Sequence, residues 1–164
     1  MYKKLFIYTI IFVFIDQLSK GLINIGMNLN QSIEIIPNFL NLTYVHNTGA
    51  AFSIFEGAKW FFIITAIIVL NIIYIFFIKD KELKNSEIVI YSLLISGIIG
   101  NLIDRVVFGY VIDFIDVNIF NFAIFNLADS FIVIAVVLLL IMMGGKNARD
   151  NSRDKWWENR YFFS

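Results

Sequence analysis

Residues 60–78 read WFFIITAIIVLNIIYIFFI, and this stretch decides the fold. It contains no charged side chain, and at about 1.5 Å per residue a helix of this length crosses the roughly 30 Å hydrocarbon core of a bilayer. The whole chain has the same character. Of its 164 residues, 59% are apolar and 16% are charged, against about 25% charged in soluble domains. The sequence therefore predicts an integral membrane protein.

Three further stretches have the composition of membrane spans, at residues 5–25, 88–107 and 127–143. The first imitates a signal peptide, but it lacks a small-x-small cleavage pattern and its helical pattern continues past the apolar run, so we expect a retained anchor. The sequence thus predicts an all-α integral membrane fold with four transmembrane helices. One domain, residues 1–164, would hold them all, with both termini on the same side.

Positive charges give the expected orientation. They lie before the first span, between the second and third, and after the fourth, at positions 3, 4, 79, 81, 84, 146, 149, 153, 155 and 160. The alternate loops, 27–59 and 108–126, contain only Lys59. The positive-inside rule therefore predicts cytoplasmic termini and two outer loops. Residues 33–45 alternate enough to suggest short β-like strands on the outer membrane surface, and we expect the tail, 146–164, to be an interfacial anchor or a disordered end.

Composition also excludes several classes of function. Thirteen Lys and Arg balance thirteen Asp and Glu, which disfavours nucleic-acid binding because no excess positive field exists. The chain has no cysteine and one histidine, His46, which excludes disulfides, thiolate nucleophiles and zinc sites built from several Cys or His. We expect no metal and no organic cofactor, so any catalysis would use carboxylates, hydroxyls, amides or lysine.

Polar residues within the spans converge on one depth. Counted from the cytoplasmic ends at about 1.5 Å per residue, they lie about 18 to 26 Å up, in the outer leaflet: Asp16, Asn101, Asp104 and Asp129. Lys20 and Arg105 lie at the same level. Ionisable groups at membrane depth cost several kcal/mol each, so such a cluster indicates a functional site.

Some of these residues also have structural explanations. Asp16 and Lys20 are four positions apart on one helix face and could neutralise each other. Arg105 could tie the end of its helix to a loop or to lipid phosphate. Ser96 and Gly100 have the small-xxx-small spacing of helix packing.

Asp113 and Asp129 resist such an explanation. Neither has a Lys or Arg within four positions on either side. Two carboxylates placed near each other and half out of water force one to hold a proton while the other is ionised. That division suits general acid–base hydrolysis of an amide, in which the ionised member activates water and the protonated member donates to the carbonyl oxygen.

Five blocks of sequence, in order, resemble one family over almost the whole chain. They are Asp16-Gln17-Leu18-Ser19-Lys20, Asn47-Thr48-Gly49-Ala50-Ala51-Phe52, Gly100-Asn101-Leu102-Ile103-Asp104-Arg105-Val106, Val111-Ile112-Asp113-Phe114 and Phe125-Asn126-Leu127-Ala128-Asp129-Ser130. The family they resemble is that of the lipoprotein signal peptidases, or type II signal peptidases, of bacteria.

The resemblance implies a membrane aspartic endopeptidase with Asp113 and Asp129 as its catalytic dyad. Such an enzyme cuts the signal peptide from a prolipoprotein just before its diacylglyceryl-modified cysteine, at the outer leaflet of the bacterial cytoplasmic membrane. The resemblance further implies that six residues bind substrate or support the dyad, namely Asn47, Gly49, Asn101, Asp104, Arg105 and Asn126. It implies that Asp16 and Lys20 brace the site. Prolipoproteins and membrane lipid would be its partners, and we expect a monomer.

Three alternatives remain open from the residues alone. A proton-coupled transporter would relay protons through its aspartates, although the inner halves of the spans lack charged residues. A Ser–Lys peptidase would use Lys20 as base with Ser19, Ser53 or Ser130 as nucleophile. A structural four-span scaffold would leave Asp113 and Asp129 without a role.

Overall fold

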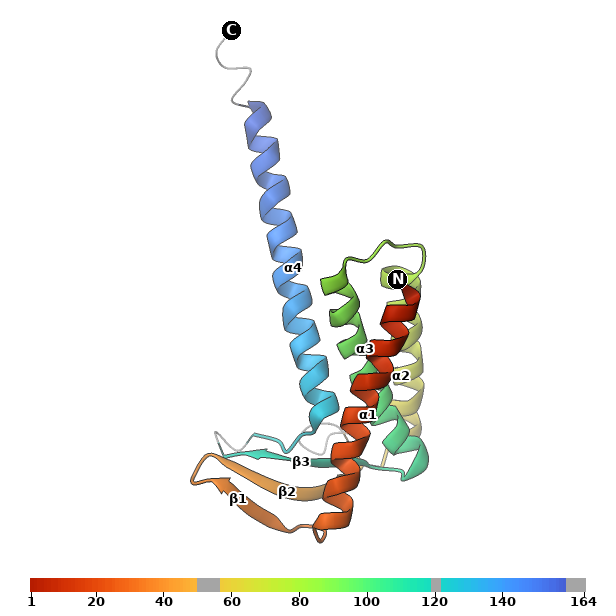
Figure 1. Ribbon diagram of the computed structural model, residues 1–164, viewed down its shortest axis with the longest axis vertical. Helices are drawn as coiled ribbons and strands as arrows, with labels where there is room; N and C mark the ends of the chain where they lie inside the picture. The colour runs from red at the N-terminus through yellow and green to blue at the C-terminus, as the bar shows by residue number, and fades with distance from the viewer. Residues whose placement is uncertain (50–56, 119–121, 159–164) are drawn as a thin grey trace.

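The computed structural model describes residues 1–49, 57–118 and 122–158, with side chains described as far as Gly144. Four long helices run along one direction, and a small sheet lies across one end of them (Figure 1). The helices are α1 (Tyr2–Gly26), α2 (Lys59–Ile73), α3 (Asn85–Val107) and α4 (Leu127–Glu158). A π-helical turn, η2 (Tyr74–Ile78), extends α2. Within these described residues, four helical stretches are long and apolar enough to cross a membrane, which confirms the four predicted apolar helices.

The fourth helix is longer than its predicted span. The expected end was residue 143, and α4 continues to Glu158, into the segment expected to be a surface anchor or disordered. The apolar pattern stops near residue 143, and Gly144 and Gly145 follow it, a residue type that often ends helices. The polar residues after them include no proline, and the helix continues through the glycines. In Figure 1, α4 packs against the other helices near the sheet and leans away from them toward its far end.

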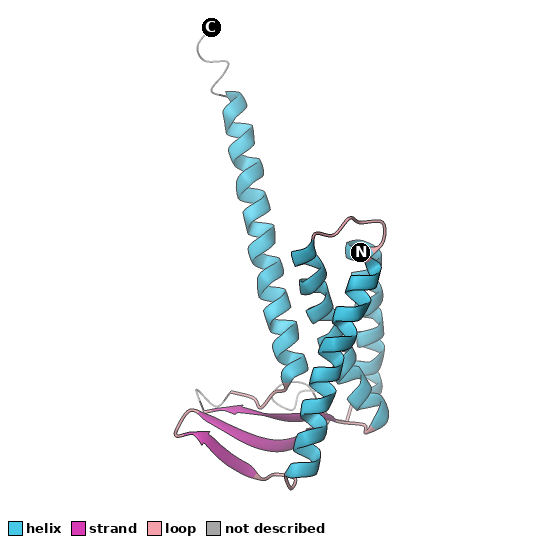
Figure 2. Cartoon of the chain, in the orientation of Figure 1, coloured by secondary structure: helices cyan, strands magenta, loops and turns pink. Residues whose placement is uncertain are grey.

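The prediction of an all-α fold is wrong in one respect, because the region expected to lie outside the membrane forms a true sheet. Figure 2 shows its three strands, β1 (Ser32–Ile36), β2 (Leu40–Asn47) and β3 (Val111–Val117). They are antiparallel in the order β1-β2-β3. The hairpin between β1 and β2 turns at Pro37 and Asn38, and Asn38 takes a positive φ of 58° that asparagine tolerates. The predicted strand-like segments of the first outer loop are therefore present.

The strand β3 was not predicted, since residues 108–126 were expected to be loop. Gly109 makes the turn from α3 into β3 with a φ of 88°, a conformation that favours glycine. The first four residues of β3 are buried. A strand buried on both faces shows no alternation of polar and apolar residues, which explains why the pattern gave no strand signal.

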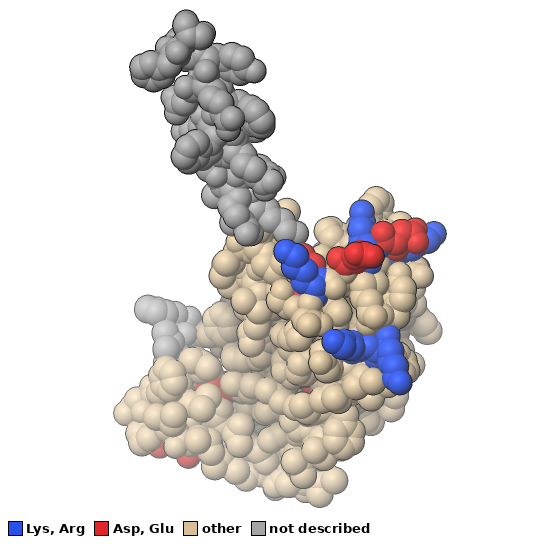
Figure 3. Space-filling view, turned by 45° about the horizontal axis from the view of Figure 1, so that its top comes forward, with Lys and Arg blue, Asp and Glu red and all other residues tan. Residues whose placement is uncertain are grey.

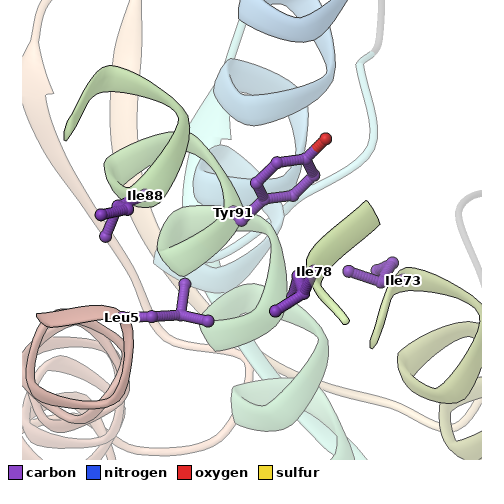
Figure 4. Close-up of a cluster of buried hydrophobic side chains, with 5 residues drawn as sticks. All are labelled: Leu5, Ile73, Ile78, Ile88 and Tyr91. Atoms are coloured by element: carbon purple, nitrogen blue, oxygen red, sulfur yellow. The ribbon is translucent and has the colours of Figure 1, made fainter. Parts of the chain in front are cut away.

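Two apolar clusters hold the elements together. One lies at the end away from the sheet and joins the start of α1 to the end of α2 and the start of α3 through Leu5, Ile73, Ile78, Ile88 and Tyr91 (Figure 4). The other consists of Tyr44, Ile112 and Phe114, with Ile23 of α1 and Leu127 of α4 packed against it. This second cluster fixes the sheet against the helix ends where β3 and α4 meet.

Charged side chains gather at the end of the bundle that carries the N-terminus and the connection between α2 and α3, and most of the remaining surface in view is uncharged (Figure 3). The exposed charged residues of this end are Lys3, Lys4, Lys79, Asp80, Lys81, Glu82 and Lys84. The sheet lies at the opposite end (Figure 1). The charge asymmetry expected from the sequence is thus an asymmetry between the two ends of the helices.

The helix α3 meets α4 through glycines. A Cβ on Gly97 would collide with the backbone oxygen of Ala128 and with Ile132, and a Cβ on Gly100 would collide with the Asp16 carboxylate. Ser96 is buried beside them. The predicted packing role of Ser96 and Gly100 is confirmed, and it brings the start of α4 close to α1 and α3.

Candidate active site

Asp113 is presented by β3 and is almost fully buried, with 2% of its surface exposed. Its Oδ2 accepts a hydrogen bond of 2.9 Å from Asn47 Nδ2, and its Oδ1 accepts one of 2.6 Å from Asn126 Nδ2. Asp113 lies opposite Val45 and Asn47 lies opposite Val111, so Asn47 reaches Asp113 along the diagonal of the two-stranded pair.

The surroundings of Asp113 favour its protonated form. Burial raises its pKa to about 7, and the nearby negative charge of Asp129 adds to the effect. The hydrogen bonds from Asn47 and Asn126 and the charge of Lys20 act in the opposite direction. The carboxyl group of Asp113 is therefore poised to gain or lose a proton near neutral pH.

Asp129 lies in the first turn of α4. Its backbone N–H donates to Asn126 Oδ1 at 3.0 Å, and its Oδ2 accepts the Asn126 backbone N–H at 3.2 Å. These reciprocal bonds form a capping box, which satisfies backbone donors that a helix start leaves unpaired. Asp129 Oδ1 accepts a third hydrogen bond, of 2.7 Å, from Asn101 Nδ2.

The two acids face one cavity of about 590 Å³. Its polar wall consists of Asp113, Asp129, Asn47, Asn101 and Arg105, and its apolar wall includes Val111, Phe125, Val133 and Ile134. Asn126 joins the acids directly, since it contacts both. The structure thus brings together the two aspartates that the sequence singled out, one from β3 and one from the start of α4.

A buried ion cluster is linked to the two aspartates through Asn101. Lys20 Nζ is 2.9 Å from Asp16 Oδ2 and 3.0 Å from Asp104 Oδ2. The predicted pairing of Asp16 with Lys20 is confirmed, and Asp104 joins it. Gln17 Nε2 also lies between the two carboxylates, 3.1 Å from Asp16 Oδ2 and 2.9 Å from Asp104 Oδ1.

Arg105 ties α3 to the first outer loop, as one reading of the sequence expected. Its Nη2 donates to the backbone oxygen of Gly49 at 2.9 Å, and its guanidinium lies 4.5 Å from the centre of the Phe62 ring. The Gly49 N–H in turn donates to Asn47 Oδ1 at 2.9 Å, which turns the Asn47 amide nitrogen toward Asp113. Arg105 and Gly49 therefore both support the side chain that holds Asp113.

The remaining predicted residues fall in two groups. The block Ala50-Ala51-Phe52 and the alternative nucleophile Ser53 lie outside the described residues. The other two candidate serines donate to backbone oxygens, Ser19 to Asp16 at 2.7 Å and Ser130 to Asn126 at 3.0 Å. Lys20 is bonded to two carboxylates and to Asn101. With its nitrogen bonded to these three acceptors, Lys20 does not provide the free amine that a Ser–Lys dyad needs.

Two features of the site were missed in the sequence. Gln17 was named only as part of the block from Asp16 to Lys20 and was given no role, because a neutral amide gives no charge signal. His46, known only as the single histidine, stacks on Tyr110 with ring centres 3.6 Å apart and hydrogen-bonds the Tyr44 hydroxyl at 2.8 Å. Burial lowers the pKa of His46. This aromatic group supports β2 just before Asn47.

The chain matches known proteins along most of its length. The family model described as signal peptidase (SPase) II matches residues 8–144. A lipoprotein signal peptidase of Staphylococcus aureus is 44% identical, over 94% of this chain and 98% of the relative, and that of S. aureus strain MRSA252 is 47% identical, over 87% and 92%. The chain also aligns with a solved structure described as a bacterial membrane enzyme determined by the in meso method at 2.3 Å resolution. The TM-score is 0.82 and the sequence identity is 41%, and the alignment covers 88% of this chain and 90% of the solved chain. The chain therefore belongs to the signal peptidase II family of lipoprotein signal peptidases.

Proposed function

We propose that Asp113 and Asp129 are the acid–base pair with which this chain cleaves signal peptides from prolipoproteins. The observation that carries the proposal is the convergence of the two carboxyl groups on one cavity, joined through Asn126. Membership of the family supports the reaction class and leaves the transporter and scaffold alternatives without support.

The chemistry follows from the two environments. The ionised carboxylate takes a proton from a water molecule, whose oxygen attacks the scissile carbonyl carbon, and the protonated carboxyl group donates to the carbonyl oxygen. The tetrahedral intermediate then collapses, and the amine leaves with a proton returned by the dyad. A carboxyl group with a pKa of about 7, such as that of Asp113, can exchange protons in this way at neutral pH.

The position of the cavity suits a lipid-modified substrate. Its apolar wall is formed by residues of α4 and by the segment before it, including Val133, Ile134 and Phe125, beside a helix apolar enough to span a membrane. A diacylglyceryl group in the outer leaflet would lie along this wall and present the bond before the modified cysteine to the dyad. An apolar wall of this kind favours acyl chains over charged groups, because burying apolar surface stabilises the complex.

The orientation follows from charge. The end of the bundle where the exposed lysines outnumber the exposed acids (Figure 3) lies away from the sheet (Figure 1), and the positive-inside rule assigns that end to the cytoplasm. The dyad would then face the outer leaflet of the bacterial cytoplasmic membrane, with all of residues 1–164 in one membrane domain. The four spans, 5–25, 60–78, 88–107 and 127–143, are part of this proposal.

The test is cleavage by the purified full chain. A synthetic precursor carrying a diacylglyceryl cysteine is expected to be cut before that residue, and the same precursor without the lipid is not. Asp113→Asn and Asp129→Asn should each abolish cleavage while leaving the protein folded in detergent. Asp116→Asn is the matched control, because Asp116 belongs to the same strand and accepts its bond from Thr43 at 2.7 Å. Normal turnover by either dyad variant would refute the proposal.

A further inference from the structure

We infer that Lys20 is a positioning residue for both acids of the dyad, acting through three acceptors that its ammonium group holds together. The inference rests on the proposed function of Asp113 and Asp129 and assigns Lys20 a role beyond neutralising its own helix. It does not place Lys20 in contact with substrate.

The ammonium group of Lys20 is completely enclosed. Lys20 has 1% of its surface exposed, and its Nζ lies 2.9 Å from Asp16, 3.0 Å from Asp104 and 3.0 Å from Asn101 Oδ1. An ammonium group has three N–H donors, so each donor has one acceptor. Pairing with Asp16 alone would have been enough to neutralise the lysine within α1, and the two additional acceptors come from α3.

The two carboxylates hold the backbone immediately before each acid. Asp16 Oδ1 accepts the backbone N–H of Ala128 at 2.9 Å, and Ala128 precedes Asp129. Asp104 Oδ2 accepts the backbone N–H of Ile112 at 3.1 Å, and Ile112 precedes Asp113. Lys20 thus holds two carboxylates in place, and each carboxylate in turn binds the backbone N–H of the residue that precedes one of the two acids.

The third acceptor, Asn101, acts on a side chain. Asn101 Oδ1 receives Lys20 Nζ and, at 3.1 Å, Asn126 Nδ2, while Asn101 Nδ2 donates to Asp129 Oδ1 at 2.7 Å. If the amide rotated by half a turn, its nitrogen would face the ammonium and its oxygen would face the carboxylate. Both contacts would be repulsive, so the charge of Lys20 acts together with the Asn126 amide to keep the Asn101 nitrogen facing Asp129.

The decisive variant removes the ammonium without leaving buried charge. In Asp16→Asn/Lys20→Met/Asp104→Asn, the asparagine oxygens can still accept the N–H groups of Ala128 and Ile112. The link of Lys20 to Asn101 is lost, together with the bonds that Gln17 donates to the two carboxylates. We expect kcat for the lipidated precursor to fall about 10- to 100-fold, since small misplacements of catalytic groups have effects of this size. KM should change less than about twofold. The acid limb of the pH profile of kcat should move to higher pH, because Asn101 no longer holds its donor toward the carboxylate.

Two more variants complete the test. Lys81→Met is the control for loss of a lysine, because Lys81 is exposed in the connection between η2 and α3, and it should match the wild type. Lys20→Arg keeps the charge but replaces the three-donor ammonium with a planar fork. We expect it to fold with normal thermal stability and with kcat lowered at least about fivefold.

The outcomes separate this inference from the proposed function. If the triple variant has the same kcat and the same pH profile as the wild-type enzyme, the positioning role of Lys20 is overturned. The proposed function would still stand in that case, provided that the wild-type enzyme cleaves the precursor and the Asp113 and Asp129 variants do not. If the triple variant does not fold, Lys20→Arg decides, and wild-type turnover in that variant would equally overturn the role. Failure of the wild-type enzyme to cleave would instead refute the proposed function.

Discussion

Asn126 and Asp129 cap each other at the start of α4, through the bonds of 3.0 and 3.2 Å between the side chain of each and the backbone N–H of the other. The Asn126 amide also donates to Asp113 and to Asn101. The start of a transmembrane helix and the acid pair are therefore built from the same atoms, and the two roles of Asn126 can be separated by substitution.

Asn126→Ser should keep the helix cap and lose the dyad contact, because a serine hydroxyl caps a helix but is too short to reach Asp113. We expect thermal stability near that of the wild type and kcat lowered about 100-fold. Asn126→Ala should lower kcat to a similar extent and also lower stability by about 1 kcal/mol, the usual value of a cap. Thermal unfolding in detergent and cleavage assays measure the two effects. Equal stability of the Ser and Ala variants would contradict the capping role.

The stability of the protein should fall as pH rises from about 4 to 7. The pKa of Asp113 is raised from its ordinary value to about 7, so the folded state binds more protons than the unfolded state in this range, and stability decreases with pH. At about 1.4 kcal/mol per pKa unit, the contribution is at most about 4 kcal/mol.

Asp113→Asn should remove this part of the pH dependence, whatever its effect on stability at a single pH. Unfolding followed across the pH range in wild type, Asp113→Asn and Asp116→Asn measures the slopes. The control variant Asp116→Asn should retain the wild-type slope. A slope in Asp113→Asn equal to that of the wild type would rule out Asp113 as the titrating group.

Gly100→Ala should damage the site rather than the helix. Alanine favours helix more than glycine does, but its Cβ would meet the Asp16 carboxylate that holds Ala128. We expect kcat to fall about tenfold or more with the four helices still formed. Gly144→Ala is the matched control, since nothing lies within 4 Å of the added Cβ there. Identical kinetics of the two variants would show that the close approach at Gly100 has no consequence.

Arg105→Lys should weaken the tie between α3 and the first outer loop. A lysine cannot reproduce the planar group that bonds Gly49 and lies over Phe62. We expect kcat/KM to fall about tenfold. Lys59→Arg, at the start of α2, serves as the comparison and should leave kcat/KM unchanged. Retention of wild-type kcat/KM by Arg105→Lys would mean that positive charge alone suffices at this position.

The sequence predicted the parts of this molecule whose physical signal is local. An uncharged run such as 60–78 has few alternatives to a membrane helix, and the absence of any cation near Asp113 and Asp129 marked them before their positions were known. The pairing of Asp16 with Lys20 followed from helical spacing.

The parts that could not be predicted depend on contacts between distant segments. The first four residues of β3 are buried by elements that precede and follow the strand, so they show no period-2 pattern. Asp104 and Gln17 join the Lys20 cluster across two helices, and helical spacing within one span carries no information about the facing helix. The capping role of Asn126 could have been predicted from the sequence, because Asn-x-x-Asp before an apolar run fits the capping pattern.

The hydrogen bond from Ala128 to Asp16 joins residues 112 positions apart, one in the first span and one at the start of the last. A nascent chain emerging from the ribosome has α1, the sheet residues of β2 and α3 long before α4 is synthesised. Under the proposed function, which requires Asp129, the cavity can therefore be complete only after the final segment has been synthesised and has packed against α1 and α3.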